Sequence, residues 1–212
     1  MTESDNGILH AYTIDGNGGG RALTGDDISK AVKDDALAWV HLDANDPGSR
    51  VWLERELTYL DNIIVDALLA GETRPRILEF EQGALLILRG VNLNENAEPE
   101  DMVSIRLWID AHRIISVRRR RLKAVKDMTE RLESGKGPKD SGEFIAALSA
   151  RLFERMETVF LELDEKLDDL EEQVMEEPDT KDRRAITAIR KQAIMFRRYI
   201  APQRDVIAYL RT

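Results

Sequence analysis

The residues that could bind a metal are histidines and carboxylates, because the chain contains no cysteine. The histidines His10, His41 and His112 lie far apart in the sequence, and none has a second histidine four residues away. Without that spacing, and without a thiolate, they match no common zinc-binding pattern. We therefore interpret them as structural or surface histidines.

The sequence contains none of the catalytic motifs that we considered. The segment Gly16–Arg21, GNGGGR, lacks the Lys-Ser/Thr pair of a phosphate-binding loop and does not open a periodic helix, so it predicts a flexible turn. The chain has no Gly-x-Ser-x-Gly motif and no thiol nucleophile. Its closely spaced carboxylates fall within one dense acidic stretch, where solvation explains them. The sequence predicts a protein that is not an enzyme.

Four consecutive arginines, Arg118 to Arg121, could contact nucleic acid or an anionic membrane surface. The run has no interleaved aromatic residue, and the whole chain carries a formal net charge of −9. We interpret it as a solvated helix start or as an ion-pair partner for the acidic arm, the dense acidic stretch between residues 154 and 179. A nucleic-acid binder remains a distant alternative, and no nucleic-acid partner is expected.

The length of 212 residues allows one large or two small domains with a sizeable core. No run approaches the ~18 consecutive apolar residues that span a membrane. The first ten residues, MTESDNGILH, lack the apolar core of a secretory signal.

The first part of the chain, up to about residue 120, predicts an α/β domain. Asp46 followed by Pro47 is typical of a helix N-terminus, and Asp61 opens a second short helix that runs to Leu69. Apolar alternation and short apolar runs between turn residues predict strands at 8–14, 37–42, 76–80, 84–91, 103–109 and 113–117. The most apolar of these runs are expected to be covered on both faces.

The sequence pattern of the last part of the chain predicts helices. After a helix at 122–132, an apolar stripe with an 11-residue repeat predicts a long helix from Ser141 to Glu177. The stripe is Ile145, Leu148, Leu152, Met156, Val159, Leu163, Leu167, Leu170 and Val174. Pro178 ends that helix, and Asp179 or Thr180 can cap the next one. We predict three units. Residues 1–121 form a sheet domain, and residues 122–178 contain helices that include the long acidic helix. Residues 179–212 form the final helix.

The final helix carries two adjacent apolar seams, so it must bury a wide face against more than one neighbour. The first seam contains one polar position, Gln203. The seams are Ile186, Ile189, Ala193, Phe196, Ile200, Ile207 and Leu210, and, beside them, Ala188, Met195, Tyr199, Val206 and Tyr209. No helix stop signal precedes Thr212, so we expect the helix to continue beyond it.

Charge is sorted between the two long helices. Residues 154–179 contain 12 acidic and 2 basic residues, and residues 180–212 contain 9 basic and 2 acidic residues. Ionic complementarity between the two arms explains this pattern, and an acidic surface that concentrates cations near a basic column is the alternative.

Three segments resemble the cytosolic domain of ZntB-type zinc transporters, a branch of the CorA family of divalent-cation transporters. They are Ala70–Arg76, AGETRPR, before an apolar strand; Asp164–Glu177, DEKLDDLEEQVMEE; and Ile189–Asp205, which contains Ile-Arg-Lys-Gln and Arg-Arg-Tyr-Ile-Ala-Pro-Gln-Arg-Asp. The resemblance implies an α+β fold: an αβα sandwich with a mixed sheet, then a long antiparallel helical hairpin whose last helix begins a stalk.

The same resemblance implies that the stalk continues into membrane helices and that five chains surround the ion path. The family signature Gly-x-Asn follows the first membrane helix. Here Gly90-Val91-Asn92 follows only a short strand-like run, so we interpret it as a strand end and a coincidence.

The implied function is a cytosolic regulatory and oligomerisation domain of a membrane transporter for divalent cations, with zinc as the expected cargo. The implied location is the cytoplasmic face of the bacterial inner membrane, with membrane contact only through helices beyond Thr212. The expected partners are other copies of the chain, in a pentamer, and divalent metal ions. The alternative is a soluble scaffold module built on the helical hairpin.

The resemblance also implies site residues. Asp66 matches a carboxylate that contributes half of a regulatory divalent-cation site in some family members. Such a site would suit magnesium better than zinc, and no cofactor is required. Pro202 lies inside the final helix and is expected to bend it. With its neighbours Arg197, Arg198, Gln203, Arg204 and Asp205 it forms the candidate point of flexion during gating.

Overall fold

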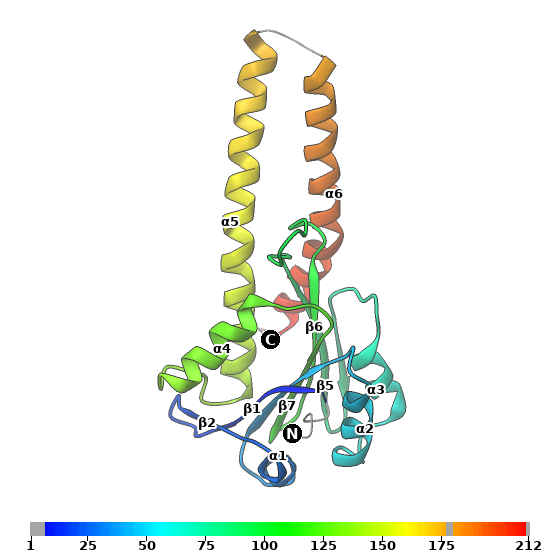
Figure 1. Cartoon of the computed structure of the whole chain (residues 1–212), viewed down its shortest axis with the longest axis vertical. Coiled ribbons are helices and arrows are strands. Elements are labelled where there is room, and N and C mark those ends of the chain that lie inside the picture. The colour runs from blue at the N-terminus through cyan, green and yellow to red at the C-terminus, as the bar shows by residue number, and fades with distance from the viewer. Residues whose placement is uncertain (1–6, 177–179, 211–212) are drawn as a thin grey trace.

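The computed structural model describes residues 7–176 and 180–210 and shows a seven-stranded sheet from which two long helices extend (Figure 1). The strands are β1 (Ile8–Ile14), β2 (Gly20–Ala22), β3 (Ala38–Asp43), β4 (Arg76–Phe80), β5 (Gly83–Gly90), β6 (Val103–Ile109) and β7 (Arg113–Arg118). The helices are α1 (Asp26–Ala31), α2 (Pro47–Glu56), α3 (Asn62–Leu69), α4 (Lys123–Glu133), α5 (Ser141–Glu176) and α6 (Thr180–Tyr209).

The sheet is mixed, as predicted. Its strand order is β2-β1-β3-β7-β6-β5-β4. The pair β3–β7 is parallel, and the other neighbouring strands pair antiparallel. Every residue of β6 is buried, which matches a strand covered on both faces. The sheet therefore consists of two antiparallel groups joined along one parallel pair.

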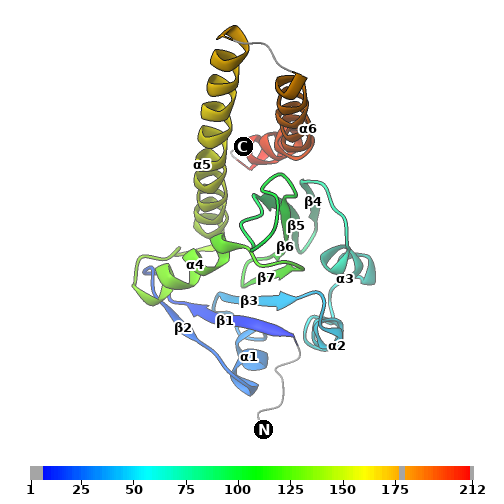
Figure 2. The ribbon, with the colours of Figure 1, turned by 45° about the horizontal axis from the view of Figure 1, so that its top comes forward.

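Helices cover both faces of the sheet, which confirms the predicted αβα sandwich. The first three helices and one face of the sheet share a core that contains Trp52, Leu68 and Trp108. On the other face, α4, α5 and α6 share a core that contains Met128, Leu148 and Phe196. Figure 2 shows the two long helices rising from this second face.

The predicted helix starts at α2 and α3 are confirmed. The Asp46 carboxylate accepts a hydrogen bond from the Gly48 amide at 2.8 Å, and Pro47 takes the first helical position. The Asp61 carboxylate accepts from the Ile63 amide at 2.8 Å. Each carboxylate satisfies an amide that has no partner within its own helix.

Two short elements were not expected. Helix α1 has six residues, and β2 has three. The prediction of a turn for all of Gly16–Arg21 is therefore wrong at its end, because Gly20 and Arg21 belong to β2. Gly16 and Gly18 do form the turn, with positive φ angles of 74° and 102° that favour glycine. A strand this short and polar leaves no periodic pattern in the sequence.

The apolar stripe predicted on α5 is buried or half-buried along its whole length. Its first half belongs to the sheet's core together with α4, because Leu148, Leu152 and Met156 pack with Val125 and Met128. The change in sequence character at residue 121 is therefore not a break in packing. The predicted divisions at 121 and 178 stay predictions, and Pro178 and Asp179 lie outside the described residues.

The two seams of α6 are buried only in part. Phe196, Gln203 and Val206 are buried, and the Phe196 ring meets Phe160 of α5 edge-on at 5.0 Å between centroids. The seam residues Ile186 and Tyr209 are exposed. Near its C-terminal end α6 changes direction, as Figures 1 and 2 both show. Within the described residues, no helix combines the length and the apolar character that crossing a membrane requires.

Candidate functional site

The polar position in the seam of α6 holds the helix to the sheet. Gln203 is 1% exposed, and its side chain pairs with the backbone of Arg89 in β5. The Arg89 amide donates to Gln203 Oε1 at 2.6 Å, and Gln203 Nε2 donates to the Arg89 carbonyl at 3.0 Å. The amide group of one helix residue therefore completes two backbone hydrogen bonds of a strand.

The sequence of β4 explains why these backbone groups are free. The pairing between β4 and β5 ends with Arg76 opposite Ile87. The next residue, Pro75, has no amide hydrogen and is confined to strand ends and edges. Arg89, two residues beyond Ile87, therefore lacks a partner strand on that side. Gln203 takes the position that an extended β4 would occupy.

The side chain of Arg89 also reaches α6. Its guanidinium lies 4.0 Å from the centre of the Tyr199 ring, a cation–π contact one helical turn before Gln203. The same guanidinium donates to the carbonyl oxygens of Thr73 at 2.5 Å and 2.8 Å and of Met102 at 2.5 Å. Burial lowers the pKa of Arg89. One residue thus connects β5, the loop before β4 and α6.

The structure places the predicted stalk residues around this contact. Arg197, Arg198, Arg204 and Asp205 are exposed on α6. Arg204 donates to one oxygen of Asp205 at 3.0 Å and 3.2 Å. Pro202 is half-buried beside Gln203, inside α6. The role of these residues in gating stays a prediction.

Asp66, the predicted half-site for a divalent cation, lies exposed on α3. Its carboxylate accepts a hydrogen bond from Arg50 of α2 at 2.6 Å. Among the described residues, no three histidine, aspartate or glutamate side chains come together in a group that could hold a metal ion. The metal role of Asp66 stays a prediction.

The three histidines are far apart in the sequence, but the structure brings two of them together. His10 and His41 face each other across β1 and β3, and their rings stack with 6.0 Å between centroids. His41 is fully buried, and Nδ1 lies 2.8 Å from the Ser116 hydroxyl. Burial lowers the pKa of His41 well below its ordinary value. A pairing between strands cannot be seen from sequence spacing.

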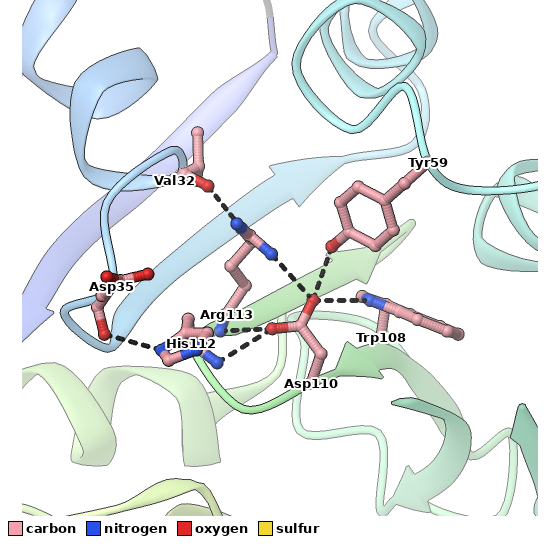
Figure 3. A network of polar contacts seen from close by, with 7 residues as sticks. All are labelled: Val32, Asp35, Tyr59, Trp108, Asp110, His112 and Arg113. Carbon is pink, nitrogen blue, oxygen red and sulfur yellow. Dashed lines mark hydrogen bonds and ion pairs between the residues drawn. The ribbon is translucent and has the colours of Figure 1, made fainter. Parts of the chain in front are cut away.

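A polar network surrounds Asp110 at the turn between β6 and β7 (Figure 3). The Asp110 carboxylate accepts from Tyr59 Oη at 2.5 Å, from Trp108 Nε1 at 3.2 Å, from the amides of His112 and Arg113 at 2.9 Å and 2.8 Å, and from the Arg113 guanidinium at 3.4 Å. Burial alone would raise the pKa of Asp110, but these hydrogen bonds lower it. The network therefore has a structural role, because it fixes the β6–β7 turn to Tyr59.

Sequence reasoning missed Arg89 and Arg106, which the structure buries in β5 and β6. Arg106 is 0% exposed and donates to the Gly71 carbonyl at 2.8 Å. The signal that could have found them is a single charge within an otherwise apolar strand, since arginine is almost never fully buried unless it has a partner.

The arginine run is divided between two environments. Arg121 is exposed just before α4, as a solvated helix start predicts. Arg119 instead donates to the carbonyls of Leu69 and Ala70, and Arg120 pairs with Asp101. Pairing of the run with the acidic helix is therefore wrong for Arg120.

Comparison with curated proteins finds close relatives. The chain is 40% identical over 210 residues to the divalent cation transporter CmaX of Pseudomonas aeruginosa, and this match covers 97% of the chain and 63% of that protein. It is 38% identical over 203 residues to the zinc transport protein ZntB of Pectobacterium atrosepticum, with 95% and 60% covered. The chain thus spans less than two thirds of the length of these relatives.

Solved structures show the same fold. The full-length CmaX protein superposes with a TM-score of 0.88 at 39% identity, covering 99% of this chain and 65% of that one. The ZntB cytoplasmic domain from Vibrio parahaemolyticus superposes with a TM-score of 0.79 at 27% identity, covering 96% of this chain and 78% of that one.

The family match extends through both the sheet and the junction with α6. Residues 34–212 match the family described as CorA-like Mg²⁺ transporter protein, so most of the sheet, both long helices and the Gln203–Arg89 contact lie within it. The chain therefore belongs to the family of CorA-like Mg²⁺ transporter proteins.

Proposed function

We propose that this chain is the cytosolic regulatory and oligomerisation domain of a membrane transporter for divalent cations. Its relatives include proteins named as divalent cation and zinc transporters, and a similar structure is named as a cytoplasmic domain. The cargo we propose is zinc, moved across the bacterial inner membrane by a membrane part to which α6 leads. The chain itself lies on the cytoplasmic side.

The observation that carries the regulatory role is the contact between Gln203 and Arg89. Two buried hydrogen bonds hold α6 to the sheet next to Pro202, where the helix lacks one internal hydrogen bond. A shift of the sheet would therefore be transmitted to α6 at the point where the helix resists bending least. In this proposal Pro202 is the point of flexion, and Gln203 is the fixed point beside it.

The oligomerisation role is supported by apolar side chains that the single chain leaves exposed on its long helices. Met175 and Leu161 of α5 are 83% and 59% exposed, and Ile194 and Ile186 of α6 are 59% and 46% exposed. Large apolar side chains that a single chain leaves exposed can become buried where two copies meet. We propose that neighbouring copies cover them, five around the ion path.

The test is zinc uptake by proteoliposomes that contain the full-length protein. Replacing Gln203 with alanine is expected to change the uptake rate several-fold, whereas Gln192→Ala, a second glutamine of α6, leaves it unchanged. A full-length protein that carries magnesium but not zinc would refute the zinc cargo. A gene that encodes no membrane helices would refute the transporter and favour the soluble scaffold module.

A further inference from the structure

We propose that the chain binds a small oxyanion with the chemistry of a phosphate group in a cavity between the sheet and α6. The cavity has a volume of about 240 Å³, whereas about 10–15 Å³ is enough to hold one water molecule. It lies where the loop before β4, the start of β6 and α6 meet. It is lined by Gly71, Glu72, Arg89, Asp101, Met102, Val103, Ser104, Arg119, Arg120 and Tyr199.

The charges around this cavity do not balance. Arg120 is paired with Asp101. The guanidinium groups of Arg89 and Arg119 donate to carbonyl oxygens and to the Asn45 side chain, and none of the described carboxylates forms an ion pair with either of them. Glu72 is the other carboxylate in the lining.

A fourth arginine increases the imbalance. Arg106 does not line the cavity itself but contacts its lining, because its guanidinium donates to the carbonyl of Gly71. It is 0% exposed, and its Nε and one terminal nitrogen have no hydrogen-bond partner among the described residues. Burial, followed by the charges of Arg119 and Arg89, lowers its pKa to about 10. Arg106 therefore remains protonated at neutral pH.

Three arginines and two carboxylates line the cavity, and Arg106 next to it adds a fourth positive charge, so positive charges exceed negative charges by two. Two of these arginines, Arg89 and Arg106, are buried, and buried charges are normally paired because removing a charge from water without a partner is expensive. A dianion would neutralise this excess. The planar guanidinium matches phosphate oxygens with two parallel hydrogen bonds, and the Ser104 hydroxyl in the lining offers a further donor.

The site would also affect α6. Tyr199 lines the cavity, and the Arg89 guanidinium that covers its ring would gain a charged partner when the anion binds. The backbone of the same Arg89 is held by Gln203. Binding is therefore expected to make α6 more rigid between Tyr199 and Gln203. The site itself does not depend on the proposed transport function, since binding and rigidity can be measured on the 212-residue chain alone.

The experiment is isothermal titration calorimetry of this chain with inorganic phosphate at constant ionic strength, with chloride as the control for screening. Hydrogen exchange measured in parallel is expected to slow for the amides near Gln203. Pyrophosphate and ADP test the source of the phosphate group. If ADP binds more tightly than pyrophosphate, the ligand is a nucleotide. If inorganic phosphate binds as tightly as ADP and pyrophosphate, the ligand is the free anion.

The main variant is Arg119→Gln, because Arg119 is exposed and its replacement is expected to leave the fold intact. Its affinity for phosphate is expected to fall about tenfold or more. Arg21→Gln is the matched control, since Arg21 is an exposed arginine at the opposite edge of the sheet. It is expected to bind phosphate as the unmodified chain does.

A second variant, Arg106→Met, removes the buried charge while filling a similar volume, and it is also expected to lose affinity. Absence of phosphate binding at millimolar concentration would overturn the proposal. Equal affinity in Arg119→Gln and in Arg21→Gln would overturn it as well, because binding would then not depend on the cavity.

Discussion

The two ends of the β6–β7 hairpin both carry charged side chains, but at the open end only some of them have partners among the described residues. At the turn, five hydrogen bonds converge on the Asp110 carboxylate, and Arg113 lies beside it (Figure 3). At the open end, two guanidinium nitrogens of Arg106 have no partner within the part of the chain that the structure describes. The same two strands therefore hold one polar cluster that is complete and another that is incomplete.

This difference separates a stabilising cluster from a binding cluster. A buried polar group that has all its partners contributes to stability, whereas one without them costs free energy. The Asp110 cluster joins the β6–β7 turn to Tyr59 and, through Arg113 and His112, to the carbonyls of Val32 and Asp35. Among the described residues, no carboxylate forms an ion pair with Arg89, Arg106 or Arg119 at the other end. Removing Asp110 and removing Arg106 should therefore change stability in opposite directions.

The largest effect is expected for Asp110→Ala. The substitution leaves the donors at the β6–β7 turn without their acceptor, so the free energy of unfolding should fall by about 3 kcal/mol or more. Urea unfolding followed by circular dichroism measures this change. Asp101→Ala is the matched control, because Asp101 is an exposed carboxylate at the other end of the hairpin, and its loss should cost less than about 1 kcal/mol.

The pH dependence of this effect has a defined sign. The hydrogen bonds that Asp110 accepts place its folded-state pKa below the unfolded value, despite its burial. Its contribution is therefore fully present above about pH 4 and declines as the pH falls through the folded-state pKa. A stability difference between the chain and Asp110→Ala that stayed constant down to the lowest pH would contradict the role of the ionised carboxylate.

The next effect is expected for Gln203→Ala, which removes the completed contact at the arginine end. The Arg89 amide and carbonyl then lose their partners, and the free energy of unfolding should fall by about 2 kcal/mol. The control Gln192→Ala removes only a 3.4 Å hydrogen bond to Glu100 and should change stability by less than about 0.5 kcal/mol. Equal losses in both variants would show that Gln203 is not a special anchor.

Arg106→Met is expected to act in the opposite direction to Asp110→Ala. Replacing an incompletely paired buried charge by an apolar side chain of similar volume is often neutral or stabilising, by up to about 1–4 kcal/mol. In phosphate-free buffer the variant should therefore be at least as stable as the unmodified chain, as urea unfolding will show. A loss of several kcal/mol would mean that Arg106 is fully paired, and the contrast between the two ends would disappear.

The smallest effect is expected for Asp66→Asn. Its ion pair with Arg50 is exposed, so stability should change by less than about 0.5 kcal/mol without added metal. If Asp66 contributes to a shared cation site, magnesium should raise the melting temperature of the full-length oligomer less in the variant than in the unmodified protein. Glu54→Gln, which alters the other carboxylate bound to Arg50, is the matched control.

Much of the fold follows from local sequence signals. The strand at Val103–Ile109 and the helix starts at Asp46 and Asp61 were predicted at the residues where the structure has them. Each depends on neighbouring residues only, through alternation or capping. Elements of three and six residues, β2 and α1, escaped prediction because they are too short for a periodic pattern.

The polar sites were predicted less well, because they depend on contacts between distant segments. Gln203 was recognised as a polar position in an apolar seam, but its partner lies 114 residues earlier. Arg89 and Arg106 were read only as parts of apolar strands. The stacked rings of His10 and His41 depend on the register of two strands, which single-sequence patterns do not specify.

The single parallel pair in the sheet has a consequence for the order of folding. Strands β4 to β7 form an antiparallel meander within Arg76–Arg118, so their contacts are close in sequence. Pairing β3 with β7 requires a closed loop that contains α2, α3 and most of that meander. Loop closure of this kind is slow, because its entropic cost precedes any gain from contacts. We therefore expect the meander to form first, and the docking of the N-terminal strands onto β7 to set the folding rate.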